Sequence, residues 1–252
     1  MISFEFPVNE RTRSLLRLEQ LYRRLAYFVD GEHANEHHSA LLTLFELMET
    51  ASRADLKADL LQELERQKQL LEPLHDNPAI EQHTLDGLLD EIELTTSRLL
   101  ELTGKFGQHL RENEWLMAIK QRAGIPGGTC QFDLPSYFLW QLKPAEERRA
   151  DLNRWAAPLM PTAGAARILL KLLRDSGKTH HYLARKGMFQ QMSGGKVVQL
   201  IRVSFDENLG VLPELSANKY ALNIRFVSAV TGEVRARQTD ADVDFELTFC
   251  KF

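Results

Sequence analysis

Apolar residues recur at every third or fourth position through the first two thirds of the chain. This spacing places apolar side chains along one face of an α-helix. In the first such segment, residues 10–30, the apolar positions include Leu15, Leu18 and Leu25. We expect about seven helices in all, the last of which ends at Gly177.

The final part of the chain alternates apolar and polar residues, which is typical of strands with one buried face and one exposed face. Residues 2–6 show the same alternation before Pro7. Because a lone short strand needs a partner, we expect this strand to join the C-terminal sheet. The predicted class is α+β, with a helical domain over 1–177 and an antiparallel β-strand domain over 178–252. The strand-like segments at the end are 180–190, 196–204, 218–228 and 242–250.

A segment rich in proline and glycine, IPGGTCQFDLPSYFLW, separates the two patterns at residues 125–140. Proline interrupts backbone hydrogen bonding, and glycine reaches backbone angles that other residues resist. We therefore expect neither a helix nor a regular strand there. Its aromatic residues favour a buried joint where the helical domain contacts the sheet, and they are Phe132, Tyr137, Phe138 and Trp140.

Composition and charge are those of a soluble protein. The 252 residues are 44% hydrophobic and 26% charged, and the net charge of −4 gives no overall attraction to nucleic acid or anionic membranes. Residues 1–177 contain 21 Lys and Arg against 27 Asp and Glu, whereas residues 178–252 contain 10 against 8. We therefore expect an acidic partner to prefer the C-terminal part.

The ends and the cysteines predict a cytoplasmic protein. The N-terminus lacks the basic and apolar regions of a leader, and no apolar run approaches the ~20 residues of a membrane span. Cys130 and Cys250 are too few for a disulfide framework or a zinc site. We expect two reduced, mostly buried thiols. The alternative is a disulfide, which would form if the fold brought the two cysteines together.

Catalytic and metal-binding patterns are missing from the chain. No glycine-rich phosphate loop, GxSxG, HExxH or CxxC sequence occurs. Cys130 and Asp133 have no identifiable base or acid partner. His33 and His37 could share a helix face as metal ligands do, but no carboxylate or cysteine framework completes a site. We expect no enzyme, no metal, no cofactor and no small-molecule substrate.

Basic side chains are the remaining candidates for binding. Arg13, Arg17 and Arg24 lie along one face of the first helix without compensating acids, although such a row is also typical of a solvated surface. Arg53 and Lys57 lie one turn apart near the start of the third helix, where cations oppose the helix macrodipole. An acidic partner would explain them, and so would chance.

The strands add Arg202 and Arg225 on or near their exposed face. Arg185, Lys186 and Lys219 are close to them in sequence. These five residues predict a basic patch on an antiparallel sheet.

Several segments resemble the ZapD family of bacterial cell-division proteins, which associate with the FtsZ ring. They occur in the family's order across nearly the whole chain. They are FEFPVNERTRSLLRLE (4–19), RADLKADLLQELERQ (53–67), IPGGTCQFDLP (125–135), KYALNIRF (219–226) and DFELTFC (244–250).

The resemblance implies a non-enzymatic cytoplasmic protein that is recruited to the division ring at midcell. It implies a homodimer, formed mainly through the helical domain, that binds the acidic C-terminal tail of FtsZ and cross-links FtsZ filaments. From the charge and the apolar pattern, we expect no nucleic-acid and no membrane partner. The basic residues that match those of the family are Arg17, Arg53, Lys57 and Arg225, and we add Arg202 and Arg13 from their faces and neighbours.

Two positions depart from relatives in the family. Glu114 stands where we expect a basic residue, and Phe138 stands where some relatives have histidine. Part of the family's basic surface is therefore expected to be missing or displaced. The alternatives to FtsZ binding are a nucleic-acid-binding module, an enzyme with an unrecognised site and a purely structural dimer.

Overall fold

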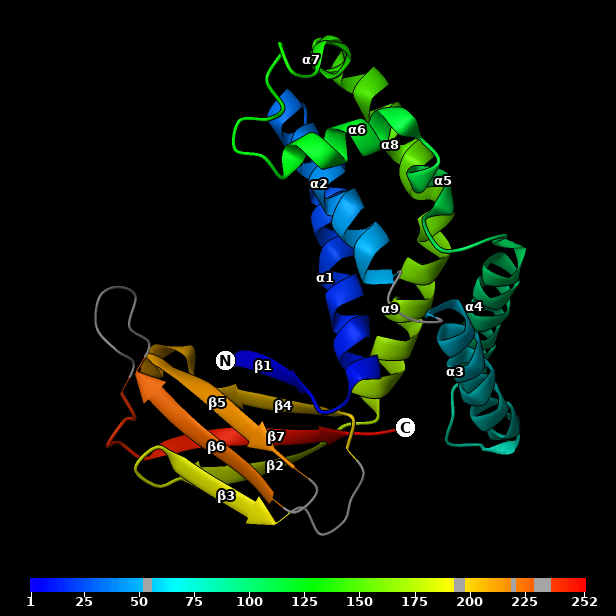
Figure 1. The fold of residues 1–252 in the computed structure, drawn as a ribbon. Coiled ribbons are helices and arrows are strands. Elements are labelled where there is room, and N and C mark those ends of the chain that lie inside the picture. The colour runs from blue at the N-terminus through cyan, green and yellow to red at the C-terminus, as the bar shows by residue number, and fades with distance from the viewer. Residues whose placement is uncertain (52–55, 193–197, 219–220, 229–236) are drawn as a thin grey trace. The chain divides into compact units, whose positions relative to one another are not determined.

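The computed structural model describes residues 1–252 except 52–55, 193–197, 219–220 and 229–236 (Figure 1). The chain forms two compact units. The sheet unit comprises Met1–Ser14 with Leu170–Phe252, and the helical unit comprises Leu15–Leu169. The units divide within helices α1 (Glu10–Asp30) and α9 (Met160–Asp175) rather than at a loop. The domain boundary that we expect after residue 177 stays a prediction.

The remaining α-helices and the short helices η1 and η2 belong to the helical unit, in agreement with the predicted α+β class. Residues 108–123 form two helices, because Asn113 accepts a hydrogen bond from the backbone N–H of Leu116 and begins a new helix there. The bounds are α2 (Ala34–Ala51), α3 (Leu56–Leu71), η1 (Glu72–Asp76), α4 (Gln82–Glu101), α5 (Gln108–Arg111), α6 (Glu114–Ala123), α7 (Pro135–Gln141), α8 (Ala145–Ala156) and η2 (Ala157–Leu159).

The predicted apolar stripe of α1 is buried. Leu15, Leu18 and Leu25 are each less than 5% exposed, and burying a leucine contributes roughly 1.5–3 kcal/mol. Tyr22 continues the stripe, and its hydroxyl donates a hydrogen bond to the backbone carbonyl of Leu159 (2.8 Å). This bond satisfies the polar end of a side chain whose ring is packed in the core.

A buried arginine ties α8 to the turn between α1 and α2. Arg148 is 5% exposed, and it donates to Nδ1 of His37 (2.8 Å) and to the carbonyl of Glu32 (2.6 Å). The Nε2 atom of His37 lies 2.9 Å from the carbonyl of Gly31. Burial and the neighbouring Arg148 lower the pKa of His37, which favours the neutral ring that this arrangement requires. Both ring nitrogens of His37 are therefore occupied by protein partners, and neither is available to a metal.

Residues 125–140 differ from the sequence-based expectation in two respects. Pro135–Gln141 form helix α7, because proline is favoured in the first turn of a helix, where its missing N–H has no partner to lose. The segment is not uniformly buried either, since Phe132 is 78% exposed while Tyr137 and Trp140 are buried. The whole segment lies in the helical unit. A contact with the sheet stays a prediction.

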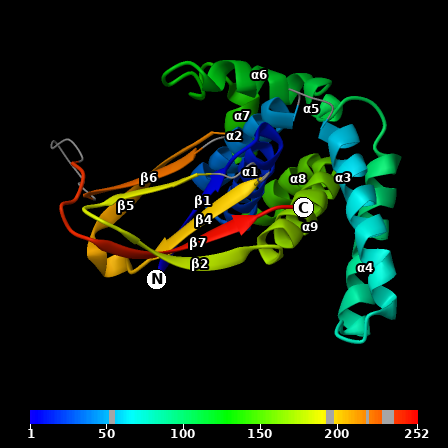
Figure 2. The same ribbon diagram turned by 90° about the horizontal axis from the view of Figure 1, so that it is seen from below.

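The sheet unit contains two antiparallel sheets, whereas the sequence predicts one. The four-stranded sheet has the order β1-β4-β7-β2 (Figure 2), and β1 pairs with β4, as predicted for the N-terminal strand. The three-stranded sheet has the order β3-β6-β5. The strands are β1 (Ile2–Pro7), β2 (Lys178–Ala184), β3 (Met188–Met192), β4 (Leu200–Phe205), β5 (Val211–Ala217), β6 (Ala221–Ser228) and β7 (Val243–Cys250), with the short helix η3 (Glu207–Leu209) before β5.

An aromatic core joins the two sheets. Phe226 of β6 lies edge-on to Phe205 of β4, with ring centroids 5.4 Å apart, and it also contacts Phe245 of β7 at 5.3 Å. Tyr182 of β2 contacts Phe189 of β3 at 4.8 Å. Tyr182 and Phe189 alternate with exposed residues along β2 and β3, and Phe226 and Phe245 each follow an exposed residue, so the predicted two-residue period separates a buried face from an exposed one there. Strand β4, which carries Phe205, has no exposed residue.

Strand β5 is absent from the sequence-based expectation. Its segment, VLPELSA, contains Pro213, which donates no backbone hydrogen bond and is typical of edge strands. The structure places β5 at one edge of the three-stranded sheet, paired with β6 on one side. The sequences SGG at 193–195 and TG at 231–232 favour tight turns, and both lie outside the described residues.

One long helical run qualifies the expectation about membrane spans. Residues Ala145–Asp175 are long and apolar enough to cross a membrane by length and composition, and half of the qualifying window is buried inside the protein. A core helix of a soluble protein passes the same test, so this run is a weak sign of a membrane segment.

Candidate functional site

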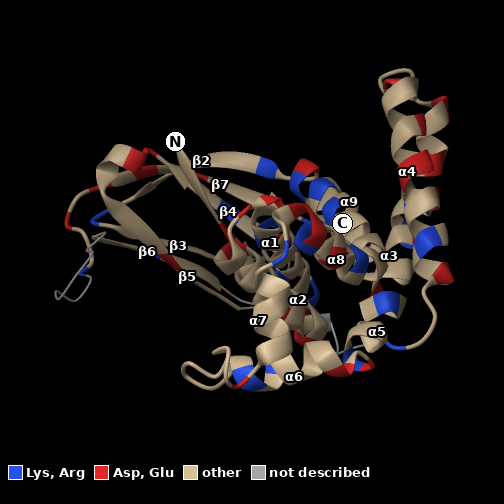
Figure 3. Cartoon of the chain, turned by 90° about the horizontal axis from the view of Figure 1, so that it is seen from above, with Lys and Arg blue, Asp and Glu red and all other residues tan. Residues whose placement is uncertain are grey.

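The predicted binding residues are distributed over both units. Arg17 and Lys57 belong to the helical unit, whereas Arg13, Arg202 and Arg225 belong to the sheet unit. Arg53 lies outside the described residues. In Figure 3 most of the Lys and Arg colouring lies on the helices, and little of it lies on the strands.

The arginine row of α1 is more compensated than its sequence suggests. Arg13 forms an ion pair with Glu10 one turn earlier, and Arg24 pairs with Glu46 of α2 at 2.5 Å. Arg17 is exposed, and no hydrogen bond or ion pair of its side chain occurs among the described residues. Of this row, Arg17 is therefore the arginine whose charge is available to a partner.

Lys57 caps the end of another helix. Its ammonium group donates to the backbone carbonyl of Leu102 (2.7 Å) and lies 3.4 Å from that of Leu100, at the C-terminus of α4. A helix C-terminus has unpaired carbonyls and a partial negative charge, both of which favour a cation. This intramolecular role accounts for Lys57 without an acidic partner.

Arg202 is also held inside the protein. Its side chain and that of Arg174 share the carboxylate of Glu5, at 3.3 Å and 2.8 Å respectively. All three side chains are less than 30% exposed. Burial raises the pKa of Glu5, but hydrogen bonds and ionic attraction from Arg174 and then Arg202 outweigh it and lower that pKa overall. The group joins β1, α9 and β4.

Arg225 lies on the outer face of the three-stranded sheet. Its Nε and Nη2 atoms donate to one carboxylate oxygen of Glu214 on β5, at 3.0 Å and 2.5 Å. Both side chains are about half exposed. They line a shallow groove of about 580 Å³ that also includes Met188, Gln190 and Asn223. Residue spacing does not identify Glu214 as a partner, because its strand, β5, is itself not predicted.

The predicted basic patch on one sheet is wrong for its two central members. Arg202 belongs to the four-stranded sheet and Arg225 to the three-stranded sheet, because the strands divide into two layers. Arg185 and Lys186 are exposed at the turn between β2 and β3, where Lys186 has a positive φ of 48°. Lys219 lies outside the described residues.

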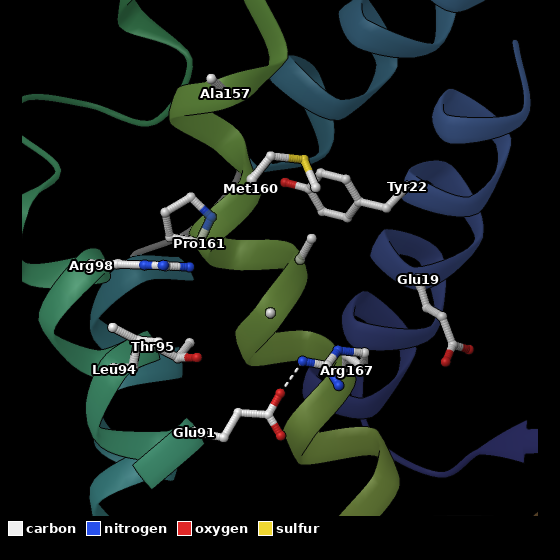
Figure 4. A pocket seen from close by; sticks show the side chains of 12 residues that line it. Glu19, Tyr22, Glu91, Leu94, Thr95, Arg98, Ala157, Met160, Pro161 and Arg167 are labelled. Atoms are coloured by element: carbon white, nitrogen blue, oxygen red, sulfur yellow. Dashed lines mark hydrogen bonds and ion pairs between the residues drawn. The ribbon is translucent and has the colours of Figure 1, made fainter. Parts of the chain in front are cut away.

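A second groove, of about 720 Å³, lies within the helical unit between α1, α4 and α9 (Figure 4). Leu94, Met160 and Pro161 provide apolar surface, and Arg98 extends over the groove in the close-up view. Arg167 of α9 pairs with Glu91 of α4 across it. The described residues that line this groove do not pair a nucleophile with a base.

The positions with reactive or unusual residues also have plain structural roles. Cys130 is exposed, which corrects the expectation of a buried thiol, while Cys250 is buried, and both are free. Asp133 pairs with Arg122 at 3.4 Å. Glu114 is exposed in the first turn of α6, where an acid favours the helix N-terminus. Across the part of the chain that the structure describes, no cluster of three His, Cys, Asp or Glu is placed to hold a metal.

Comparisons with known proteins agree with the sequence resemblance. The family model of ZapD, described as a cell division protein, matches residues 16–225. A curated relative from Chromobacterium violaceum, named Cell division protein ZapD, is 77% identical over 252 residues, which is the whole of both chains. The match therefore includes both units and is not confined to one of them. This chain belongs to the ZapD family of cell division proteins.

Proposed function

We propose that this protein is a cytoplasmic homodimer that binds the C-terminal tail of FtsZ and cross-links FtsZ filaments at the division ring. The observation that carries the proposal is membership of the ZapD family along the whole chain. The exposed guanidinium groups of Arg17 and Arg225 support it. A planar guanidinium pairs with carboxylates through two parallel hydrogen bonds, which suits an acidic partner.

Cross-linking follows from symmetry and repetition. A twofold dimer has two copies of each binding site, and a filament displays one tail per subunit. Exposed ion pairs contribute only about 0–1 kcal/mol each, so a single tail binds weakly. Binding several tails at once raises the effective concentration and converts weak contacts into a stable bundle.

Co-sedimentation with polymerised FtsZ tests the proposal directly. We expect the protein to pellet with intact FtsZ, and to stay in the supernatant when the FtsZ tail is deleted. Light scattering by bundles should fall as NaCl is raised, because salt screens exposed charges. Bundling that survives deletion of the tail would show that the tail is not the contact. Failure to pellet with intact FtsZ would favour a purely structural dimer.

Charge removal then locates the contacts. We expect Arg17→Gln and Arg225→Gln each to weaken pelleting about threefold or more, because each change removes one exposed attractive charge. Lys57→Gln and Arg202→Gln are the matched comparisons, since both cations are held by intramolecular partners. Equal losses from all four variants would mean that general charge, and not these two arginines, controls binding.

A further inference from the structure

The outer face of the three-stranded sheet has a simple and unusual composition. Strands β3, β6 and β5 together contain one basic residue, Arg225, and one acidic residue, Glu214. The strand register aligns Met188, Arg225 and Glu214 in one row across the sheet. The next row on the same face contains Gln190, Asn223 and Ser216. Among the described residues that line the groove, Arg225 and Glu214 are the two charged ones.

Apolar side chains flank this pair on the exposed face. Met188, which pairs with Arg225 across the strands, is 59% exposed, and Leu212, two residues before Glu214 on β5, is 41% exposed. Met192 is 72% exposed but pairs with Ala221, farther along the face. Methionine is flexible and polarizable, and it adapts to different apolar partners. A carboxylate bound at Arg225 would thus have apolar surface beside it, which supplies the affinity that an exposed ion pair lacks.

Glu214 occupies the position that an incoming carboxylate needs. Only one of its oxygens accepts from Arg225, and that oxygen takes both the Nε and the Nη2 hydrogen bonds. The pair is exposed, so its disruption costs little free energy, and Glu214 can turn into solvent. The two carboxylates cannot both lie against the same edge of the guanidinium without repelling each other.

We infer that Glu214 is an internal competitor for Arg225 and that it limits the affinity of this face for an acidic segment with a neighbouring apolar residue. Given the proposed function, on which this inference rests, the segment is the FtsZ tail. Arg225 pairs with its carboxylate, Met188 contacts its apolar side chain, and Glu214 is displaced. In the free protein Glu214 neutralises the charge of Arg225, which suppresses binding of unrelated anions.

The test is fluorescence anisotropy with a labelled peptide of the FtsZ tail and the full-length protein. We expect Glu214→Gln to tighten binding about two- to fivefold, because it keeps the side-chain shape and removes the competing charge. Arg225→Gln and Met188→Ser should each weaken binding. In the double variant Glu214→Gln with Arg225→Gln, the gain from Glu214→Gln should disappear, since the competition acts through Arg225.

Glu207→Gln is the matched control, because Glu207 is an exposed carboxylate in the same unit but lies on η3, outside the groove. Glu207→Gln removes the same unit of charge as Glu214→Gln. We expect the Glu207→Gln variant to bind the tail peptide with the affinity of the unmodified protein. Equal tightening by Glu207→Gln and Glu214→Gln would overturn the inference in favour of a net-charge effect. Tightening by Glu214→Gln that persists without Arg225 would also overturn it.

The same measurements separate this inference from the proposed function. If the Glu214, Arg225 and Met188 variants all bind the tail as the unmodified protein does, this face is not the tail-binding site. The proposed binding of FtsZ would still stand. Absence of tail binding by the unmodified protein would overturn both. If Met188→Ser leaves tail binding unchanged but dissociates dimers in sedimentation velocity, a second copy of the chain covers the face, and the inference fails.

Discussion

The two sheets of the sheet unit use the same ion-pair chemistry in opposite ways. In the four-stranded sheet, Glu5 is 21% exposed and is held by Arg174 and Arg202 together. In the three-stranded sheet, Glu214 is 51% exposed and is held by Arg225 alone. Both carboxylates face an arginine on a neighbouring strand. Burial and the number of partners are what differ.

This difference separates a structural contact from an available one. A partly buried carboxylate with two cations cannot leave without exposing unpaired charges in a poorly solvated place, so Glu5 and Arg202 are fixed. An exposed pair is exchanged for water or another ion at little cost. We therefore expect stability to depend on Glu5, and binding to depend on Glu214 and Arg225.

The largest effect on stability should come from Glu5→Gln. The amide keeps the shape but removes the charge between two arginines, and we expect a loss of about 2–3 kcal/mol in the free energy of unfolding. Urea unfolding followed by far-ultraviolet circular dichroism measures this loss, because that signal includes the strands. Glu214→Gln is the control and should change stability by less than about 0.5 kcal/mol. Equal losses of stability in the two variants would contradict the claim that Glu5 is a structural contact and Glu214 is not.

The pH dependence of stability tests whether the charge of Glu5 is responsible for its contribution. The pKa of Glu5 is lowered in the folded protein relative to the ordinary value of 4.5. Its stabilising contribution is therefore complete above about pH 4.5 and is lost as the pH falls through the lowered pKa. We expect the stability difference between the unmodified protein and Glu5→Gln to be constant from about pH 7 to pH 5 and to shrink in more acidic solution. A difference that stays constant down to about pH 2 would contradict the ion-pair assignment.

A smaller effect should come from Lys57→Met in the helical unit. This change removes the cation at the C-terminus of α4, and we expect a loss of about 0.5–1 kcal/mol. Tryptophan fluorescence is a suitable signal, because Trp115, Trp140 and Trp155 are the three tryptophans of the chain and all lie in this unit. Arg17→Gln should leave the unfolding midpoint nearly unchanged. A larger loss from Arg17→Gln would mean that Arg17 has a structural role.

Much of the fold can be predicted from local patterns. The stripe of α1 and the alternation in β6 and β7 predict buried faces correctly, since a helix or strand must bury its apolar face whatever lies opposite. Strand β5 escapes prediction because Pro213 and polar residues weaken the alternation at a sheet edge. Helix α7 escapes it because proline both ends helices and begins them, and its role depends on the residues after it.

The candidate site is less predictable than the fold. Arg17, Lys57, Arg202 and Arg225 look alike in sequence, because each is a basic residue with an apolar residue on either side. The structure distinguishes them by partners far away along the chain: the end of α4 for Lys57, Glu5 for Arg202 and Glu214 for Arg225. Such pairings depend on strand register and helix packing, which residue spacing does not encode.

The class of fold, the return of the N-terminal strand to the C-terminal sheet, and the family all follow from the amino-acid sequence. The first two depend on the period of apolar residues, and the family depends on short segments that each resemble the family's own. The division of the strands into two layers, and the identity of the arginines that form intramolecular ion pairs, are seen in the tertiary structure alone. The physical reason is that the charge of an arginine is available or compensated according to what the fold places within a few ångströms of it, and that neighbour is set by long-range packing.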